Sequence, residues 1–442
     1  MKIHVALFLL FSLVNTSKAA PRAIDQFPDL AKLPDSSAEL QDAIDNRQLI
    51  PAGVHRITKP LEVDLSVLKS AIIRPASGAV TLIMDGPGPA IRLRGNHEGS
   101  AAPKSFKAAT WHQRMPVISD LEIVGNHPES VGIELVGTVQ PIVSKVAVRW
   151  CHHGIRIAVR NRNIAISDCQ LYENSGVGLF LDDVNLHQIN VSNSHISYNR
   201  EGGIVVRDGN VRNLQITGCD IEANMPGNSQ KTEAANIFID VSTSEFDKSK
   251  SIAEVAITGC TIQHSANYGQ NGQTIAPGGA NIRLRGKEIW PIDSVTITGN
   301  VISDTCTSID IDRSMDVTIS GNTFFAPKPA NLLVSNSKRI LVNGNTFNPR
   351  QFERPGTIQF ENSVDCVISD CILNDFKTKD GALILKNCEG FQVRGNVLTG
   401  CESGIRVVDS RDSNIHDNLF RKFTGKEKIE VDSKSSDLSI RQ

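Results

Sequence analysis

Arginine and aspartate side chains recur at alternate positions in three short segments of the chain. Asp240 ends NIFID, Arg283 and Arg285 alternate in NIRLR, and Asp310 and Asp312 alternate in SIDID. Arginine can neutralise the carboxylate of a uronic acid and so lower the cost of removing the adjacent proton. Carboxylates can act as acid and base or hold Ca²⁺ through oxygen. This mixture is typical of a carbohydrate site, and Ca²⁺ is the one cofactor it suggests.

Two tyrosines and two histidines provide candidate proton-transfer groups near these segments. Tyr198, Tyr268 and His264 are predicted in the variable turns that lead into the charged strands, and His187 in a turn that leaves one. A base and an acid on the two sides of a basic groove would suit β-elimination. The alternative is that these side chains serve only as local hydrogen-bond partners. Three other histidines are interpreted as structural, namely His152, His153 and His195.

Such residues need a regular scaffold, and the sequence contains one. The pattern apolar-x-apolar-x-(Gly/Asp)-(Asn/Cys)-x-apolar recurs in twelve units, as in VTITGNVI, VTISGNTF and ILVNGNTF. Its small-residue position falls at Leu121, Val146, Cys169, Ser194, Cys219, Cys260, Asn300, Asn322, Asn345, Cys371, Asn396 and Asn418. Most intervals are 22 to 26 residues, and two are 41 and 40 residues. The chain is therefore a repeat protein.

Each unit contains three short runs of alternating apolar residues separated by small or polar corners, which is strand spacing and not helix spacing. Stacked units of this kind predict an all-β fold, a single right-handed parallel β-helix of about twelve or more coils of ~23 residues. We expect a cap and first strands over residues 21–60, with SAELQDAIDNRQ as a short capping helix, and the β-helix over residues 61–442. Asparagines at one corner can bond along the stack.

The repeat, together with SAELQDAIDNRQ and the strand LIPAGVHRI, resembles the pectate-lyase-like β-helix superfamily over nearly the whole chain. In most of its enzymes, the resemblance implies, the strand after the variable turn carries the sugar-binding cleft. A polygalacturonase-like hydrolase would show a paired Asp followed by Gly-His-Gly and Arg-x-Lys. Here Asp182-Asp183 is present without the other two elements, and the Asp-Pro-His element of alginate epimerases is missing.

The outward residues of that strand are predicted to form two rows across successive coils. The first row is Glu134, Arg156, Phe180, Val205, Phe238, Arg283 and Asp310, and the second is Val136, Ala158, Asp182, Arg207, Asp240, Arg285 and Asp312. Opposite charges on neighbouring coils can pair, so Asp182 and Arg207 favour a surface salt-bridge ladder, with Arg207 as an alternative substrate contact. Phe238 is predicted to offer a stacking platform, and the insertions of the two long units to make a trough around it.

The nine cysteines are interpreted mainly as packing residues, because four of them, Cys169, Cys219, Cys260 and Cys371, occupy the asparagine corner. None shows the short paired spacing of zinc ligands. Cys219 and Cys260 lie on adjacent coils and can approach disulfide distance. Since the total is odd, at least one thiol is unpaired.

Residues 1–20 are predicted to be a cleaved signal peptide. They contain Lys2, the apolar run VALFLLFSLV and small residues that place the cleavage site near Ala19 or Ala20. We therefore expect a secreted or periplasmic protein. No later stretch is long and apolar enough to insert in a membrane, and a formal charge of -2 gives no reason to expect nucleic acid. A well-capped solenoid of this kind is expected to be a monomer.

Three functions remain open from the sequence. The first is a polysaccharide lyase or uronate epimerase acting on an acidic glycan. The second is a glycoside hydrolase that uses two of Asp240, Asp310 and Asp312. The third is a non-catalytic glycan-binding or cell-surface solenoid.

Overall fold

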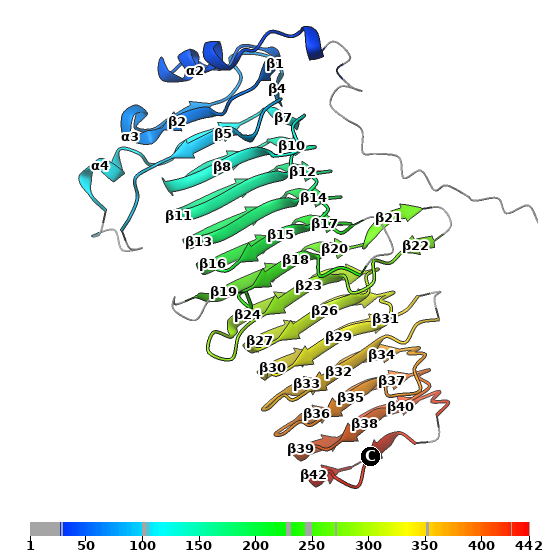
Figure 1. The fold of residues 1–442 in the computed structure, drawn as a ribbon. Helices are drawn as coiled ribbons and strands as arrows, with labels where there is room; N and C mark the ends of the chain where they lie inside the picture. The colour runs from blue at the N-terminus through cyan, green and yellow to red at the C-terminus, as the bar shows by residue number, and fades with distance from the viewer. Residues whose placement is uncertain are drawn as a thin grey trace, which may run out of the picture.

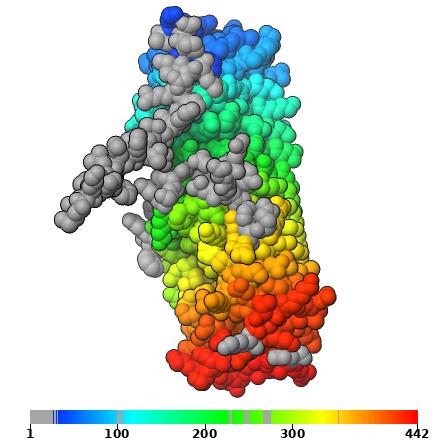
Figure 2. Space-filling view, turned by 90° about the vertical axis from the view of Figure 1, so that its right-hand side faces the viewer, coloured from blue at the N-terminus to red at the C-terminus, as the bar shows by residue number. Residues whose placement is uncertain are grey.

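A computed structural model describes residues 27, 30–99, 104, 106–226, 231–243, 250–269, 272–350, 353–425 and 427–441, without the side chains of 31 and 266–274. The predicted signal peptide lies outside these residues. Parallel strands stack coil upon coil into one elongated column that runs in sequence order from end to end (Figures 1 and 2). The predicted all-β parallel β-helix is confirmed, and within the described residues each face of the column contains 14 strands.

Three parallel sheets form the faces of the column. Sheet 1 consists of β1 (Gly53–Ile57), β4 (Val80–Met84), β7 (Glu122–Gly125), β10 (Ala147–Arg149), β12 (Gln170–Tyr172), β14 (His195–Ser197), β17 (Asp220–Glu222), β20 (Thr261–Gln263), β25 (Val301–Ser303), β28 (Thr323–Phe325), β31 (Thr346–Asn348), β34 (Ile372–Asn374), β37 (Val397–Thr399) and β40 (Leu419–Arg421).

Sheet 2 follows sheet 1 in each coil. It consists of β2 (Leu61–Asp64), β5 (Gly88–Arg94), β8 (Ser130–Val139), β11 (His153–Ser167), β13 (Val177–Ser192), β15 (Gly202–Arg207), β18 (Ala235–Asp240), β23 (Ala280–Arg285), β26 (Thr307–Asp312), β29 (Ala330–Ser335), β32 (Thr357–Glu361), β35 (Leu383–Lys386), β38 (Ile405–Val408) and β41 (Ile429–Val431).

Sheet 3 completes the coil, and the long strands β11 and β13 bend around a corner and belong to sheets 2 and 3 together. Its other strands are β3 (Ile72–Ile73), β6 (Val117–Ser119), β9 (Ile142–Ser144), β16 (Asn210–Thr217), β19 (Ser251–Thr258), β24 (Ile292–Thr298), β27 (Ser314–Ser320), β30 (Lys338–Asn343), β33 (Val367–Ser369), β36 (Gln392–Arg394), β39 (Arg411–His416) and β42 (Ser436–Ile440). A separate antiparallel hairpin is formed by β21 (Ala266–Gly269) and β22 (Gly272–Thr274).

The N-terminal end of the column is covered as predicted. α2 (Ser37–Asp45) lies within SAELQDAIDNRQ and buries Leu40, Ala43 and Ile44 at the end of the core. The other short helices are η1 (Leu30–Lys32), α3 (Leu65–Leu68) and α4 (Ala108–Trp111). Across the residues that the structure describes, no helix is long and apolar enough to cross a membrane.

Small corner residues and an asparagine stack explain the repeat. Gly299 takes a φ of 66°, a backbone conformation that favours glycine, and the next residue, Asn300, turns its side chain into the stack. The Asn300 Nδ2 atom donates to Asn322 Oδ1 at 3.0 Å, and Asn322 Nδ2 donates to Asn345 Oδ1 at 3.0 Å. This confirms the predicted ladder at the corner between sheets 3 and 1.

A second asparagine ladder, which the repeat pattern did not predict, runs along the corner between sheets 1 and 2. It links Asn174, Asn199, Asn224, Asn236 and Asn281 through side-chain amides 2.7 to 3.0 Å apart. All five side chains are fully buried. Because this corner carries the long insertions, the ladder holds their ends in place.

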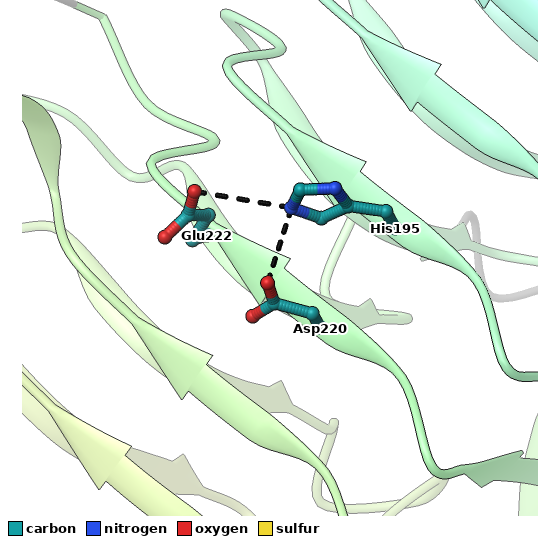
Figure 3. A group of neighbouring side chains, drawn as sticks. All are labelled: His195, Asp220 and Glu222. Atoms are coloured by element: carbon teal, nitrogen blue, oxygen red, sulfur yellow. Dashed lines mark ion pairs between the residues drawn. The ribbon is translucent and has the colours of Figure 1, made fainter.

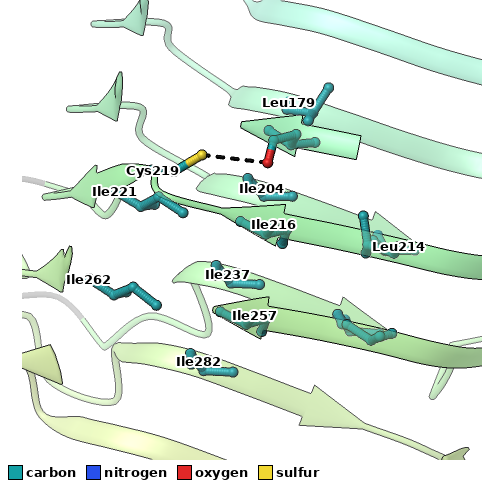
Figure 4. Close-up of a cluster of buried hydrophobic side chains, with 14 of the residues drawn as sticks. Leu179, Ile204, Leu214, Ile216, Cys219, Ile221, Ile237, Ile257, Ile262 and Ile282 are labelled. Carbon is teal, nitrogen blue, oxygen red and sulfur yellow. Dashed lines mark hydrogen bonds between the residues drawn. The ribbon is translucent and has the colours of Figure 1, made fainter. Parts of the chain in front are cut away.

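The corner cysteines are packing residues, as predicted. Cys169, Cys219, Cys260 and Cys371 are buried, and the thiol of Cys219 donates to the carbonyl of Val191 among isoleucine and leucine side chains (Figure 4). All nine cysteines, each of them in the described part of the chain, are free thiols. Cys219 and Cys260, which the sequence allows to approach disulfide distance, are not bonded to each other, and the Sγ atom of Cys260 accepts the backbone N–H of Cys219 at 3.5 Å.

Candidate functional site

The two predicted rows on the outer face of sheet 2 have the predicted register. In the first row Phe180 aligns with Val205, and Phe238 with Arg283. The remaining partners also match at each step, from Glu134 to Asp310 in the first row and from Val136 to Asp312 in the second. Register follows because every inward residue is apolar and a one-residue slip would turn it to solvent.

Ion pairs on this face run both within a row and between the two rows. Arg156 in the first row contacts Asp182 in the second at 2.6 Å and Glu134 in its own row at 2.8 Å. Arg207 lies 5.9 Å from the centre of the Phe180 ring, within reach of a cation–π contact. The predicted pairing of Asp182 with Arg207 is therefore wrong, because Arg156 lies closer to the carboxylate.

The insertions cover sheet 2 where an open trough was predicted. Loops 231–234 and 275–279 meet through a hydrogen bond from Thr232 N to the Pro277 carbonyl, and Arg283 donates to the carbonyls of Glu233 and Gly278. The side chain of Phe238 is consequently only 6% exposed and that of Arg283 only 3%. The prediction that Phe238 is a stacking platform is wrong, because the ring is buried in an apolar cluster beside Arg283, the residue to which the loops are bonded.

The three candidate catalytic carboxylates are held by neighbouring groups. Asp240 is buried and accepts hydrogen bonds from Ser242 N at 2.8 Å and Ser242 Oγ at 2.6 Å. Asp310 Oδ2 lies 3.0 Å from Arg283 Nε, and Asp310 Oδ1 accepts from Arg285 Nη1 at 3.0 Å. The charge of Asp310 is thus balanced by two guanidinium groups.

Asp312 is also engaged by neighbouring groups. Its side chain pairs with Arg313 and accepts from Ser335 Oγ at 3.0 Å and Asn336 Nδ2 at 2.6 Å. Inverting and retaining hydrolases need two carboxyl groups that face the sugar and are available for proton transfer or attack. In this geometry Asp240, Asp310 and Asp312 act as hydrogen-bond and ion-pair partners of the protein itself.

An open trough lies on sheet 2 beyond the covered segment. Its volume is about 500 Å³, and it is lined by Pro329, Ala330, Leu333, Thr357, Gln359, Asp380, Ile384, Lys386, Arg406 and Val408. Leu333, Gln359, Ile384 and Arg406 continue the first row directly from Asp310. The sequence contained this signal, since the same alternation continues through LLVS, TIQFE and LILK.

The proposed His–Tyr pair is divided between two edges of the column. His187 lies within β13, in the half that belongs to sheet 3, between Arg162 and Arg212; the prediction that it lies in a turn is wrong because β13 continues around the corner. Burial and the two arginines lower the pKa of His187. Tyr198 follows β14 at the opposite edge of sheet 2, as predicted. Tyr268 lies in β21, and its side chain is outside the described residues.

A polar cluster on the outer face of sheet 1 brings together His195, which is predicted to be structural, and Asp220 and Glu222, which the sequence pattern did not single out. His195 Nε2 lies 3.1 Å from Asp220 Oδ2 and 3.9 Å from Glu222 Oε1, and the three side chains point toward one another (Figure 3). Pairing with Asp220 and then Glu222 raises the pKa of His195 to about 9, and His195 in turn lowers the pKa of Glu222. Burial, together with Glu222, raises the pKa of Tyr198.

His264 joins this cluster from the turn after β20. Its Nε2 atom lies 3.9 Å from Glu222 Oε2, and its Nδ1 atom lies 3.7 Å from Asp304 Oδ2. Among the described residues, the group that could hold a metal ion is His195, Asp220 and Glu222, whose ligand atoms lie within 4.8 Å of one another. The alternation in HIS and DIE on neighbouring strands was the available sequence signal.

Comparison with known proteins defines the class. Residues 115–245 and 246–420 match the family described as right handed beta helix region, and the chain belongs to that family. No curated protein matches the sequence. The chain is similar in fold to solved β-helix structures at low identity.

Three of these structures show which kinds of protein share the fold. The tailspike protein 3 of bacteriophage CBA120 is 13% identical with a TM-score of 0.50, over 93% of this chain and 61% of that one. The A-module of the Azotobacter vinelandii mannuronan C-5 epimerase AlgE4 is 14% identical with a TM-score of 0.45, over 93% and 96%. PfbA, a surface adhesin of Streptococcus pneumoniae, is 12% identical with a TM-score of 0.39, over 90% of each chain. At these identities the likeness concerns the fold.

Proposed function

We propose that this chain is an exported β-helix protein that binds an acidic polysaccharide along the outer face of sheet 2. The observation that carries the proposal is the trough of about 500 Å³ that continues the charged rows beyond the inserted loops. Export rests on the signal-like residues 1–20, and N-terminal sequencing of the mature protein tests it. The protein is proposed to act as a monomer, which light scattering tests.

The lining of the trough suits a chain of uronic acids. Leu333 and Ile384 offer apolar surface to the C–H faces of sugar rings, and Gln359 offers an amide for hydroxyl groups. Lys386 lies 2.8 Å from Glu361, and Arg406 lies 3.8 Å from Glu430, in pairs that are about half exposed. Exposed pairs of this kind contribute little, so a uronate carboxylate can replace the protein carboxylate.

The geometry favours binding over hydrolysis because the three aspartates on sheet 2 are already engaged. A lyase or epimerase activity is the second candidate, and one observation favours it. Tyr198 and His264 both lie against Glu222, which supplies an acid, a base and a carboxylate near the edge of sheet 2. In that case the Arg207 guanidinium, which is exposed at the end of β15 on sheet 2, is a candidate contact for a uronate.

Binding is tested by titrating the mature protein with polygalacturonate and alginate oligosaccharides in a calorimeter. The double variant K386M/R406M is expected to bind at least tenfold more weakly, and the affinity of the native protein to fall as salt is raised. The control is Arg339→Met, which removes an arginine that pairs with Asp316 on sheet 3 at 2.7 Å. An equal loss of affinity in the double variant and in R339M would contradict the proposal that the trough binds the glycan.

Activity is tested on the same glycans, with and without Ca²⁺, by ultraviolet absorbance of an unsaturated uronate and by reducing ends. Absorbance that is lost in Tyr198→Phe would establish the lyase candidate, and C-5 inversion seen by proton NMR the epimerase. Reducing ends without absorbance would contradict our interpretation of the aspartates. Binding without either signal leaves the glycan-binding function.

A further inference from the structure

The outer face of sheet 1 carries a cluster that the glycan-binding proposal does not use. His195 on β14 and Asp220 on β17 are direct neighbours in the parallel ladder, and Glu222 lies two residues further along β17 on the same face. Side chains two residues apart on a strand share a face, and neighbouring strands are ~4.8 Å apart. The ladder therefore brings one imidazole and two carboxylates together without any loop.

The distances match those within a metal coordination shell. A tetrahedral ion with bonds of ~2.0–2.2 Å keeps its ligand atoms ~3.3–3.6 Å from one another. The Nε2 atom of His195 lies 3.1 Å from Asp220 Oδ2 and 3.9 Å from Glu222 Oε1. The ligand atoms of all three residues lie within 4.8 Å of one another, so small side-chain rotations would place them around one ion.

A fourth candidate ligand, His264, lies beside Glu222, outside the group of three whose ligand atoms lie within 4.8 Å of one another, and would turn toward them to share an ion. His264 directs Nε2 toward Glu222 at 3.9 Å, and its other ring nitrogen faces Asp304 at 3.7 Å. The Asp304 side chain is only 4% exposed, and its Oδ1 atom accepts no hydrogen bond within the described part of the chain. A carboxylate behind a ligating histidine fixes the ring orientation and raises its basicity, and metal sites commonly use this arrangement.

We propose that His195, Asp220 and Glu222 form a binding site for a divalent first-row transition cation, with His264 as the fourth ligand and Asp304 as its positioning residue. Imidazole nitrogen selects ions of the Zn²⁺ class, whereas Ca²⁺ takes six to eight oxygen ligands. Two histidines and two carboxylates offer too few oxygens for calcium. The site lies on a different face from the trough and is tested independently of glycan binding there, although it shares Glu222 and His264 with the lyase candidate.

The test uses tag-free mature protein and ZnCl₂ as the probe, in a calorimetric titration with a competing chelator. One Zn²⁺ is expected per chain, with no comparable binding of CaCl₂. Asp220→Asn and Glu222→Gln keep the side-chain shapes and are each expected to weaken Zn²⁺ binding at least tenfold. Asp304→Asn is expected to weaken it less than either of them, because Asp304 acts only through His264.

The matched control is His416→Gln, since His416 Nδ1 pairs with Asp417 Oδ2 at 2.8 Å on the surface near the other end of the column. This variant is expected to bind Zn²⁺ like the native protein. Circular dichroism without metal verifies that each variant is folded. Zn²⁺ binding that is absent, that is equal for Ca²⁺, or that is unchanged in both D220N and E222Q would overturn the proposal, and the cluster would then be an ion-pair network only.

Discussion

His153 is expected to make the stability of this β-helix fall as the solution becomes acidic. Its Nδ1 atom accepts the backbone N–H of Val177 from the next coil at 3.0 Å, and its ring lies 5.0 Å from the ring of Phe180. A nitrogen that accepts this bond cannot carry a proton. Burial first, and then the charges of His152, Arg156 and Arg207, lower the pKa of His153 from 6.5 to about 3.

The sign and size of the effect follow from that shift. The unfolded chain takes up the His153 proton near pH 6.5 and the folded chain only near pH 3, so stability is lost as pH falls through this window. Each pH unit corresponds to ~1.4 kcal/mol, and the loss at pH 4 relative to pH 8 is roughly 3 kcal/mol from this one group.

The assay is urea unfolding of native protein and His153→Asn between pH 8 and pH 4. Asparagine places an amide oxygen where Nδ1 lies, so it can accept the Val177 N–H without titrating. Subtracting the two curves removes the titration of all shared carboxylates. The difference in unfolding free energy between H153N and the native protein is expected to shift by roughly 3 kcal/mol in favour of H153N between pH 8 and pH 4. Parallel curves would refute this account of His153.

Two further predictions concern the scaffold. Asn322→Leu removes the side-chain carbonyl that accepts from both the backbone and the side-chain amide of Asn300, so we expect a loss of roughly 2–4 kcal/mol in unfolding free energy. The control is Asn414→Leu, at an exposed position with an ordinary strand backbone, for which we expect a loss under ~1 kcal/mol. Equal losses would contradict the ladder's role. Arg283→Met leaves the Asp310 carboxylate with one arginine and frees the loop carbonyls of Glu233 and Gly278. We therefore expect the unfolding free energy to fall by roughly 3 kcal/mol and proteolysis within loops 231–234 and 275–279 to become faster. Unchanged cleavage would show that Arg283 does not hold these loops.

The scaffold and its strand register were predictable from the sequence for a physical reason. Inward residues such as Ile282 and Ile309 must be apolar in every coil, and parallel stacking allows one register only. The same alternation predicts from the sequence alone that Phe238 lies beside Arg283 and Arg285 beside Asp312, as the structure has them. The asparagine ladder between sheets 3 and 1 was predictable because asparagine recurs at one position of the repeat.

The solvent exposure and the ion-pair partners of the predicted site residues on sheet 2 were not predictable in the same way. Whether Phe238 faces solvent depends on loops 231–234 and 275–279, which have no repeat and whose path is set by contacts with Arg283. Side-chain reach also decided which of several adjacent carboxylates Arg156 and Arg285 contact, since each guanidinium can reach the neighbouring row.

The sequence by itself determined that this chain is a stack of parallel coils and which residues face outward on sheet 2, because local period and burial suffice for both. Only the tertiary structure decided that the insertions close over that face, that an open trough begins beyond them, and that His195, Asp220 and Glu222 meet on sheet 1. Those outcomes depend on loop packing and on contacts between residues 25 to 50 positions apart, which no local pattern encodes.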